Sequence, residues 1–285
     1  IRRLPEEDRE TMVARFARAY EDKQSFHHET RVVRPDGQVR TLFDKVEVIL
    51  DARGEVIALA GACLDITARK RNELLEHDRG RILELVAQDK PLDEILDSVV
   101  HALEHQRPGL RGSLTLWRNN HIAGTSAPSM PAGFVPALHA LLRSEDGRVF
   151  GMAAVSGQPL LVADTASHPT WARMRGFRQE YRVASCWSVP ILSANGLVLG
   201  VLNLLGTTPA ECSERDLRLL DSVSRLASVA IEHRELTDKL AHQAQHDALT
   251  GLPNRLLFQD RLGQALAQAQ RNGQQVAVIY MDLDR

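Results

Sequence analysis

Two acidic residues close to the end of the chain could hold a hard metal cation. Asp282 and Asp284 follow the apolar run 276–281, and Leu283 between them offers a backbone carbonyl. Carboxylate and carbonyl oxygens at the end of a strand suit Mg²⁺, which can hold the phosphate oxygens of a nucleotide at the same time. Two acidic residues after a strand are also typical of a turn or a helix cap, so both interpretations remain open on the residues alone.

A second group of residues could line a small-molecule pocket. Trp187 directly follows Cys186 in a strand-like run, and Trp171 lies upstream. Neighbouring residues of a strand face opposite sides of the sheet, so only one of the pair would face a pocket. Because pockets combine apolar walls with a few polar groups, we expect one bounded by Trp187 and the loop 164–171, against the alternative of a tryptophan that only fills the core. Trp171 would be a second wall, and the expected polar anchors are Asp164, Ser185 and Ser188.

Histidine pairs suggest a metal site that the spacing does not support. His242 and His246 lie four residues apart and would share one face of a helix. No third ligand accompanies them in the sequence, and none accompanies the neighbours His27 and His28. We interpret all four as surface histidines.

Polar residues also surround a turn near the C-terminal end of the chain. Asp247 precedes Gly251 and Pro253, and Asn254 and Arg255 follow them. Glycine and proline together mark a turn, and asparagine is a favoured residue at a helix start. The residues therefore predict a capped loop that leads into a helix.

Composition places the chain among ordinary globular proteins. Of its 285 residues 44% are hydrophobic and 25% charged, which excludes disordered and fibrous classes and predicts about two domains. Lys and Arg number 35 and Asp and Glu 37, which gives a net charge of −2. This charge argues against a nucleic acid as the main partner. For the same reason we expect a pocket ligand to be a small neutral molecule or a small anion. No apolar run reaches the roughly 18 residues of a membrane-spanning helix. Three scattered cysteines indicate a reducing compartment, and we expect a cytoplasmic protein.

The elements that must position these residues follow from hydrophobic periodicity and turn signals. The ends of the chain, at Ile1 and Arg285, lie inside helix-like and strand-like sequence, so we expect a fragment of a longer protein. Expected helices span 6–22, 68–88, 92–103, 214–245 and 255–271. Expected strands span 26–34, 39–50, 56–64, 113–117, 159–163, 185–192, 197–205 and 276–281, the last as a short buried strand.

Two of the long helices carry apolar stripes that favour pairing. The helix at 214–245 has Leu219, Val223, Leu226 and Ala230 on one face, which is more than a small sheet can cover. Parallel pairing with a second copy would close such a stripe, and we expect a homodimer. The helix at 68–88 has a partial stripe of the same kind, with a lone solvated helix as the alternative.

The N-terminal part of the chain resembles the C-terminal half of a PAS domain. The resemblance covers residues 1–70 and rests on RVVRPDG at 31–37 and DITARK at 65–70. The first strands of that family are absent from this stretch, so the resemblance implies no haem or flavin site.

The middle of the chain resembles a GAF domain. The resemblance covers residues 78–236 and rests on GQPLLVAD at 157–164, HPTW at 168–171 and SCWSVPI at 185–191. It implies an α+β fold with a central antiparallel sheet flanked by helices, preceded by the partial PAS meander and joined to it by long linker helices.

The last part of the chain resembles the start of a GGDEF domain, the diguanylate cyclase module. DALTGLPNR at 247–255 and AVIYMDLD at 277–284 carry the resemblance, which implies the first helix and strand of that domain. In the family, the positions of Asp282 and Leu283 bind Mg²⁺. The segment with Asp247, Asn254 and Arg255 seats the incoming signalling helix.

These resemblances imply a sensory and regulatory fragment of a cyclic di-GMP turnover protein that makes cyclic di-GMP from GTP. His246-Asp247 and Asp260-Arg261-Leu262 also resemble proteins in which an EAL phosphodiesterase domain follows the GGDEF domain, and with such a domain the same signal would control hydrolysis of cyclic di-GMP instead. The fragment alone is expected to be inactive, because the guanine-binding residues of the family lie beyond Arg285. The alternative is a sensory and dimerisation scaffold with a degenerate GGDEF domain. The expected boundaries are 1–67 for partial PAS, 68–88 for the linker helix, 78–236 for GAF, 214–246 for the signalling helix and 247–285 for the truncated GGDEF start.

Overall fold

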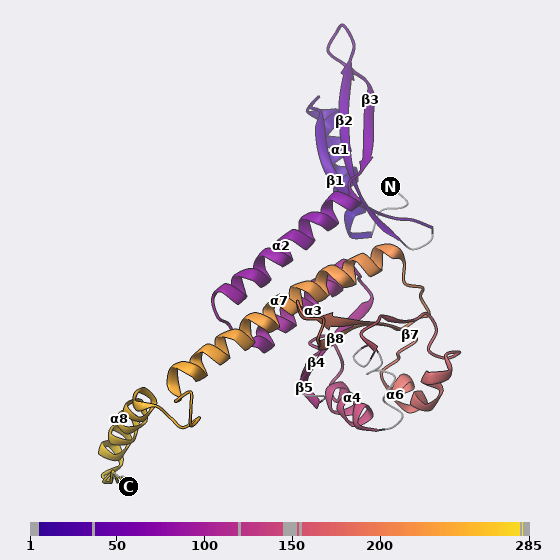
Figure 1. The fold of residues 1–285 in the computed structure, drawn as a ribbon. Helices are drawn as coiled ribbons and strands as arrows, with labels where there is room; N and C mark the ends of the chain where they lie inside the picture. The colour runs from indigo at the N-terminus through magenta and orange to yellow at the C-terminus, as the bar shows by residue number, and fades with distance from the viewer. Residues whose placement is uncertain are drawn as a thin grey trace. The chain divides into compact units, whose positions relative to one another are not determined.

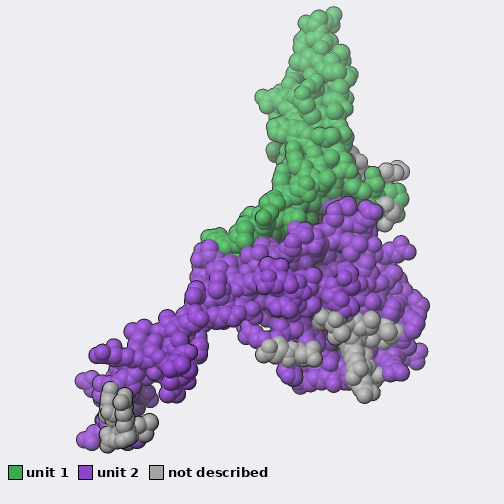
Figure 2. Space-filling model, in the orientation of Figure 1, with its two compact units in different colours: residues 1–84, 101–109 green, residues 85–100, 110–285 purple. Residues whose placement is uncertain are grey.

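The computed structural model describes residues 6–35, 38–118, 121–144, 153, 156–279 and 281. The chain divides into two compact units (Figure 2). Unit 1 comprises residues 1–84 and 101–109, and unit 2 comprises residues 85–100 and 110–285. Helix α3 (Leu92–Gln106) contributes residues to both units.

Unit 1 is a helix followed by an antiparallel three-stranded meander, as the sequence predicts. Phe16 of the helix meets Phe26 of the first strand edge to face, with ring centroids 5.5 Å apart. In the turn between the second and third strands, the Asp51 carboxylate accepts hydrogen bonds from the amides of Arg53 and Glu55. The elements are α1 (Glu6–Glu21), β1 (Phe26–Val33), β2 (Val39–Leu50) and β3 (Val56–Asp65), with strand order β1-β2-β3.

The third strand of this meander is an open edge. Nine of the ten residues of β3 are exposed, and from position 56 to 64 the strand has neither a charged residue nor a proline. Charges and prolines are the usual protection of an edge strand, so β3 is a surface on which another strand could pair.

Helix α2 (Thr67–Ala87) leaves this meander from a fixed starting point. The Asp65 carboxylate accepts the Thr67 amide at 2.9 Å, and the Thr67 hydroxyl oxygen accepts the Thr41 amide of β2 at 2.8 Å. The start of the helix is therefore tied to the middle of the sheet.

Unit 2 is built on a five-stranded antiparallel sheet with strand order β5-β4-β8-β7-β6. Helix α7 lies across one face of the sheet, and α4 and α6 lie on the other (Figure 1). The strands are β4 (Leu110–Arg118), β5 (His121–Ser126), β6 (Leu160–Val162), β7 (Ser185–Leu192) and β8 (Val198–Gly206). The helices are α4 (Phe134–Arg143), η2 (Pro169–Met174), α6 (Arg175–Glu180), α7 (Glu214–Gln245) and α8 (Arg255–Asn272).

Two glycines allow the central strands to pair closely. Gly196 has φ +78° in the predicted β7–β8 hairpin, where the Ser193 amide donates to the Leu197 carbonyl at 2.8 Å. A Cβ on Gly200 would lie 2.6 Å from the carbonyl oxygen of Thr115 on β4, so only glycine fits at this crossing.

Helix α7 begins with a capping box and is then buried along one side. The Ser213 hydroxyl accepts the Asp216 amide, and the Asp216 carboxylate accepts the Ser213 amide. The predicted dimer stripe is partly wrong, because Val223 and Ala230 are buried within the chain's own fold. The helix that carries them packs against β7 and β8.

The sequence-based assignment also missed four of the described elements and placed one wrongly. Strand β5, helix α4, the short helix η2 and helix α6 were not predicted. The predicted buried strand at 276–281 is wrong for its described residues: 276–279 and 281 have neither helix nor strand, and Val278 and Ile279 are exposed. An apolar run becomes a strand only when another strand pairs with it.

Candidate functional site

The two faces of the unit 2 sheet are both buried but differ in chemistry. The face toward α7 carries Trp187 on β7, Leu202 and Leu204 on β8 and Leu114 on β4, in cross-strand register. The Trp187 indole N–H donates to the carbonyl of Ala210 at 3.2 Å. This face is therefore an ordinary apolar core whose single indole donor is satisfied.

The opposite face carries a row of small polar side chains across three strands. The Ser188 hydroxyl donates to the Asn203 amide oxygen at 2.6 Å, and the Asn203 amide nitrogen donates to the Ser113 hydroxyl at 3.3 Å. These three residues are 2% exposed or less. We call them the polar floor. Buried hydroxyls and amides are costly unless paired, so this row is a specific feature of the face.

A second polar contact continues this face toward α4. The Thr125 hydroxyl of β5 donates to the Thr115 hydroxyl at 3.2 Å and lies 2.9 Å from Nε2 of His139 on α4. Partial burial, and then the nearby Arg143, lowers the pKa of His139. The imidazole is therefore neutral at pH 7, like the hydroxyls beside it.

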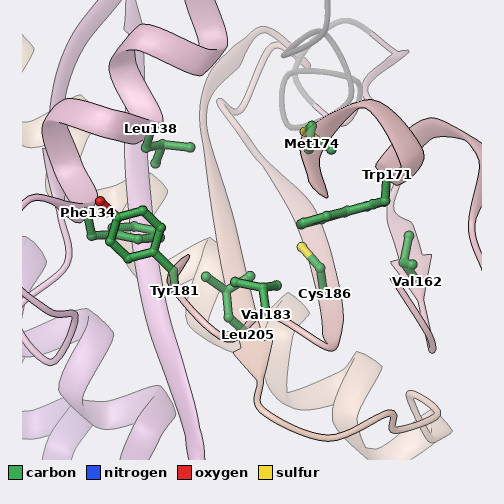
Figure 3. Packing of buried hydrophobic residues seen from close by; sticks show 9 residues of the cluster. All are labelled: Phe134, Leu138, Val162, Trp171, Met174, Tyr181, Val183, Cys186 and Leu205. Carbon is green, nitrogen blue, oxygen red and sulfur yellow. The ribbon is translucent and has the colours of Figure 1, made fainter. Parts of the chain in front are cut away.

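A cluster of apolar side chains covers one end of the polar face. Figure 3 shows Trp171 of η2 pointing toward Cys186 of β7, and Phe134 of α4 lying against Tyr181. The Phe134 and Tyr181 rings meet edge to face with centroids 5.3 Å apart. The full cluster is Phe134, Leu138, Val162, Trp171, Met174, Tyr181, Val183, Cys186 and Leu205.

The predicted pocket residues are not brought together. Trp171 and Ser188 lie on the polar side of the sheet. Trp187 and Ser185 alternate with them and lie on the α7 side, where the Ser185 hydroxyl donates to the Thr208 carbonyl at 3.0 Å. One pocket cannot be lined by both tryptophans, and Trp187 is a core residue.

Asp164, the remaining predicted anchor, shapes a turn. Its carboxylate accepts the Ala166 amide at 2.8 Å, and its carbonyl accepts the Ser167 hydroxyl at 3.3 Å. Sequence reasoning missed Ser113 and Asn203 of the polar floor, although an asparagine inside the apolar run 197–205 was a usable signal.

Cys186 belongs to this apolar cluster, and its thiol is unreactive at neutral pH. Burial raises the pKa of its thiol to about 12, opposed only by a contact with the Ser188 hydroxyl at 3.4 Å. Reactive cysteines have lowered pKa values and solvent access, so Cys186 is not a nucleophile or a redox sensor at neutral pH.

The turn after α7 is tied back onto the last residues of that helix. The Asn254 amide donates to the Gln245 carbonyl and its side chain to the Ala244 carbonyl, both at 2.8 Å. Gly251, at φ +69°, allows the tight reversal, in which its amide donates to the Asp247 carbonyl at 2.9 Å. These hydrogen bonds fix the start of the following segment to the last turn of α7.

Two of the residues predicted at this junction are hydrogen-bonded. The Thr250 amide and hydroxyl, and then the Leu249 amide, donate to the Asp247 carboxylate and lower its pKa. The Asn254 side-chain oxygen caps α8 by accepting the Leu256 and Leu257 amides. Arg255 is exposed at the first position of α8.

The predicted metal positions Asp282 and Leu283 lie outside the described residues. The described ranges contain His27, His28, His242 and His246. Within these ranges, no three His, Cys, Asp or Glu side chains lie together in a group that could hold a metal ion. In the same part of the chain, no helix is both long enough and apolar enough to cross a bilayer.

The architecture defines a class: an α+β module with an antiparallel sheet between helical layers. The chain belongs to the GAF domain family, whose family model matches residues 89–232. The PAS fold matches residues 1–63, and the diguanylate cyclase GGDEF domain matches residues 244–285. The predicted order of partial PAS, GAF and GGDEF start and the predicted α+β fold are confirmed, whereas the EAL domain stays a prediction.

Individual proteins that are similar to parts of the chain include a sensor and a diguanylate cyclase. The chain is 29% identical over 222 residues to the methyl sulfide methyltransferase-associated sensor of Methanosarcina acetivorans, covering 77% of this chain and 22% of that protein. It is 54% identical over 46 residues to the diguanylate cyclase TpbB of Pseudomonas aeruginosa, covering 16% of this chain and 11% of that protein. The chain thus spans less than a quarter of either relative.

A solved structure is similar over the middle of the chain. The GAF domain of a phosphoenolpyruvate-protein phosphotransferase from Coxiella burnetii is 19% identical, with a TM-score of 0.47, and the match covers 58% of this chain and 96% of that one.

Proposed function

We propose that this chain is the sensory and regulatory part of a cytoplasmic protein that makes cyclic di-GMP from GTP. The PAS, GAF and GGDEF matches, and the diguanylate cyclase among the relatives, support the class of reaction. The observation that carries the regulatory role is the continuity of α7. One unbroken helix of 32 residues packs on the GAF sheet at its start and is hydrogen-bonded to the GGDEF start at its end.

In this proposal, α7 transmits a change at the GAF sheet as a rotation or a change of pairing. Two cyclase domains must meet to join two GTP molecules, so we propose a homodimer. Asp282 and Leu283 would bind Mg²⁺, which neutralises and orients the triphosphate. No specific observation favours the alternative of a scaffold with a degenerate GGDEF domain.

The transmission step is testable by changing the phase of the helix. A chimaera joins residues 1–285 to the remaining cyclase domain of the Pseudomonas relative. One inserted residue between Ala241 and His242 turns everything beyond it by about 100°, whereas seven inserted residues restore the phase to within about 20°. We expect loss of cyclic di-GMP formation with one residue and recovery with seven. Equal activity in both insertions would contradict transmission through α7.

We further propose that the GAF module senses a small uncharged polar molecule on its polar face. The supporting observation is that the buried groups of the polar floor are neutral and hydrogen-bonded to one another, which favours a ligand that exchanges hydrogen bonds with them over one that needs a buried counter-ion. A thermal-shift screen of uncharged and anionic metabolites tests the idea. We expect some uncharged metabolites to raise the Tm of the wild type and of Trp187→Phe, but not the Tm of Asn203→Leu. Hits confined to anions, or hits unaffected by Asn203→Leu, would contradict it.

A further inference from the structure

A surface hollow in unit 2 lies between the end of strand β4 and the C-terminal part of helix α7. Arg118, the last residue of β4, forms one wall, and side chains of α7 form the other. The hollow has a volume of about 610 Å³, which is within the range of small-molecule sites, and it shares no residue with the polar floor. The described residues that line it are Arg118, Glu235, Asp238, Lys239, His242 and Gln243.

An ion pair joins the two walls of the hollow. The Arg118 guanidinium donates to the Glu235 carboxylate at 3.1 Å, between β4 and α7. The Arg118 side chain is 57% exposed, so its guanidinium can turn toward a ligand in the hollow without leaving a buried position. Glu235 is therefore both the present partner of Arg118 and the natural competitor of any anion that would bind it.

The charges that line the hollow leave one cation over. Both acidic side chains are engaged, because Glu235 pairs with Arg118 and Asp238 accepts Arg234 of the same helix at 3.0 Å. Lys239 forms no ion pair with any residue that the structure describes. Its ammonium is thus the uncompensated charge, and it favours an anion as the ligand.

The hydrogen-bond donors of the hollow fit a tetrahedral oxyanion. The side chains of Lys239, His242 and Gln243 lie three and four residues apart on one face of α7, and none of them makes a hydrogen bond to another described residue. They offer an ammonium, an imidazole and an amide donor, and Arg118 adds a guanidinium from the opposite wall. A phosphate group accepts hydrogen bonds from several directions and pairs with arginine through two oxygens, whereas a carboxylate offers only two oxygens in one plane.

We propose that this hollow binds the phosphate group of a small anion through Lys239 and Arg118, and that the bound phosphate displaces Glu235 from Arg118. We call Arg118, Lys239, His242 and Gln243 the α7 anion site. The site lies beyond Ile231, the last buried residue of α7, and before the GGDEF start. Its ligand would contact the helix outside the part that packs on the sheet.

Isothermal titration of inorganic phosphate into the full 285-residue chain, at constant ionic strength and pH 7.5, tests this inference. We expect saturable binding with a Kd of about 1 mM, and clearly weaker binding of acetate. Lys239→Gln should raise the Kd for phosphate about tenfold, the usual effect of losing one charge-assisted hydrogen bond. The matched control Arg225→Gln changes the net charge equally on the same helix, but its guanidinium pairs with Asp221 outside the hollow, so the Kd should stay within about twofold.

A second variant should act in the opposite direction. Glu235→Gln releases Arg118 from its carboxylate and should lower the Kd for phosphate by about threefold or more. Its matched control Glu214→Gln, in the first turn of α7, removes the same charge from an exposed pair with Arg218 and should have little effect.

Each contrary result overturns a stated part of the inference. No saturable phosphate binding below about 10 mM would overturn the site. Equal weakening by Lys239→Gln and Arg225→Gln would show a general charge effect and would also overturn it. Acetate that binds as tightly as phosphate would overturn the ligand class. Weaker phosphate binding in Glu235→Gln would overturn the displacement of Glu235.

Discussion

Trp187→Phe separates a core role for Trp187 from a ligand-contacting role. The side chain is 1% exposed and donates one hydrogen bond, at 3.2 Å, to the Ala210 carbonyl. Loss of that bond costs about 1 kcal/mol. The smaller ring leaves roughly 40 Å³ unfilled, which adds about 1 kcal/mol, and the lost transfer energy brings the total to about 2–3 kcal/mol.

Thermal unfolding followed by tryptophan fluorescence measures this effect in unit 2 alone. All three tryptophans of the chain, at 117, 171 and 187, belong to that unit, and two remain in the variant. We expect the Tm to fall by about 5–10 °C. The control Leu197→Ala, at an exposed hairpin position, should stay within about 0.5 kcal/mol of the wild type. A Trp187→Phe protein as stable as the wild type would refute the packing argument and would favour a ligand-contacting role for Trp187.

Three further predictions concern reactivity, the junction and the open edge. Burial raises the pKa of the Cys186 thiol to about 12. Its alkylation by iodoacetamide at pH 8, followed by mass spectrometry, should therefore be about 100-fold slower or more than alkylation of the partly exposed Cys212. Similar rates at the two cysteines would contradict the burial of Cys186. Asn254→Ala removes the cap of α8 and should cost about 1 kcal/mol, seen as faster hydrogen exchange in its first turn, whereas unchanged exchange would rule out the cap. Ala60→Lys on β3 should reduce aggregation measured by light scattering, unlike Ala52→Lys in the adjacent turn; equal aggregation would argue against edge pairing.

Local signals were enough for much of the fold. The Asn195-Gly196 turn predicted the β7–β8 hairpin, and periodicity predicted α7, because in both cases neighbouring residues decide the structure. Helix α4 also carried a usable signal, since Phe134, Leu138 and Leu141 have helical spacing. The predicted strand at 276–281 failed because a strand depends on a partner and not on its own residues.

The candidate site was less predictable, because it depends on which face of the sheet each helix covers. Alternation correctly placed Cys186 and Trp187 on opposite faces but could not say which face α7 would take. The same ambiguity put Val223 in the predicted dimer stripe, where the structure buries it on its own unit. Tertiary packing decides both points.

The central claim is that α7 of this chain controls cyclic di-GMP formation through its pairing. The most direct test compares two variants of the cyclase chimaera: Leu236→Glu, at an exposed apolar side chain of α7, and Ala241→Glu, at an exposed small side chain of the same helix. Cyclic di-GMP formed from GTP and Mg²⁺ should fall about tenfold or more with Leu236→Glu, because a charge at an apolar position of the helix opposes pairing, and should stay near wild type with Ala241→Glu. Equal rates of product formation in the two variants would contradict the account.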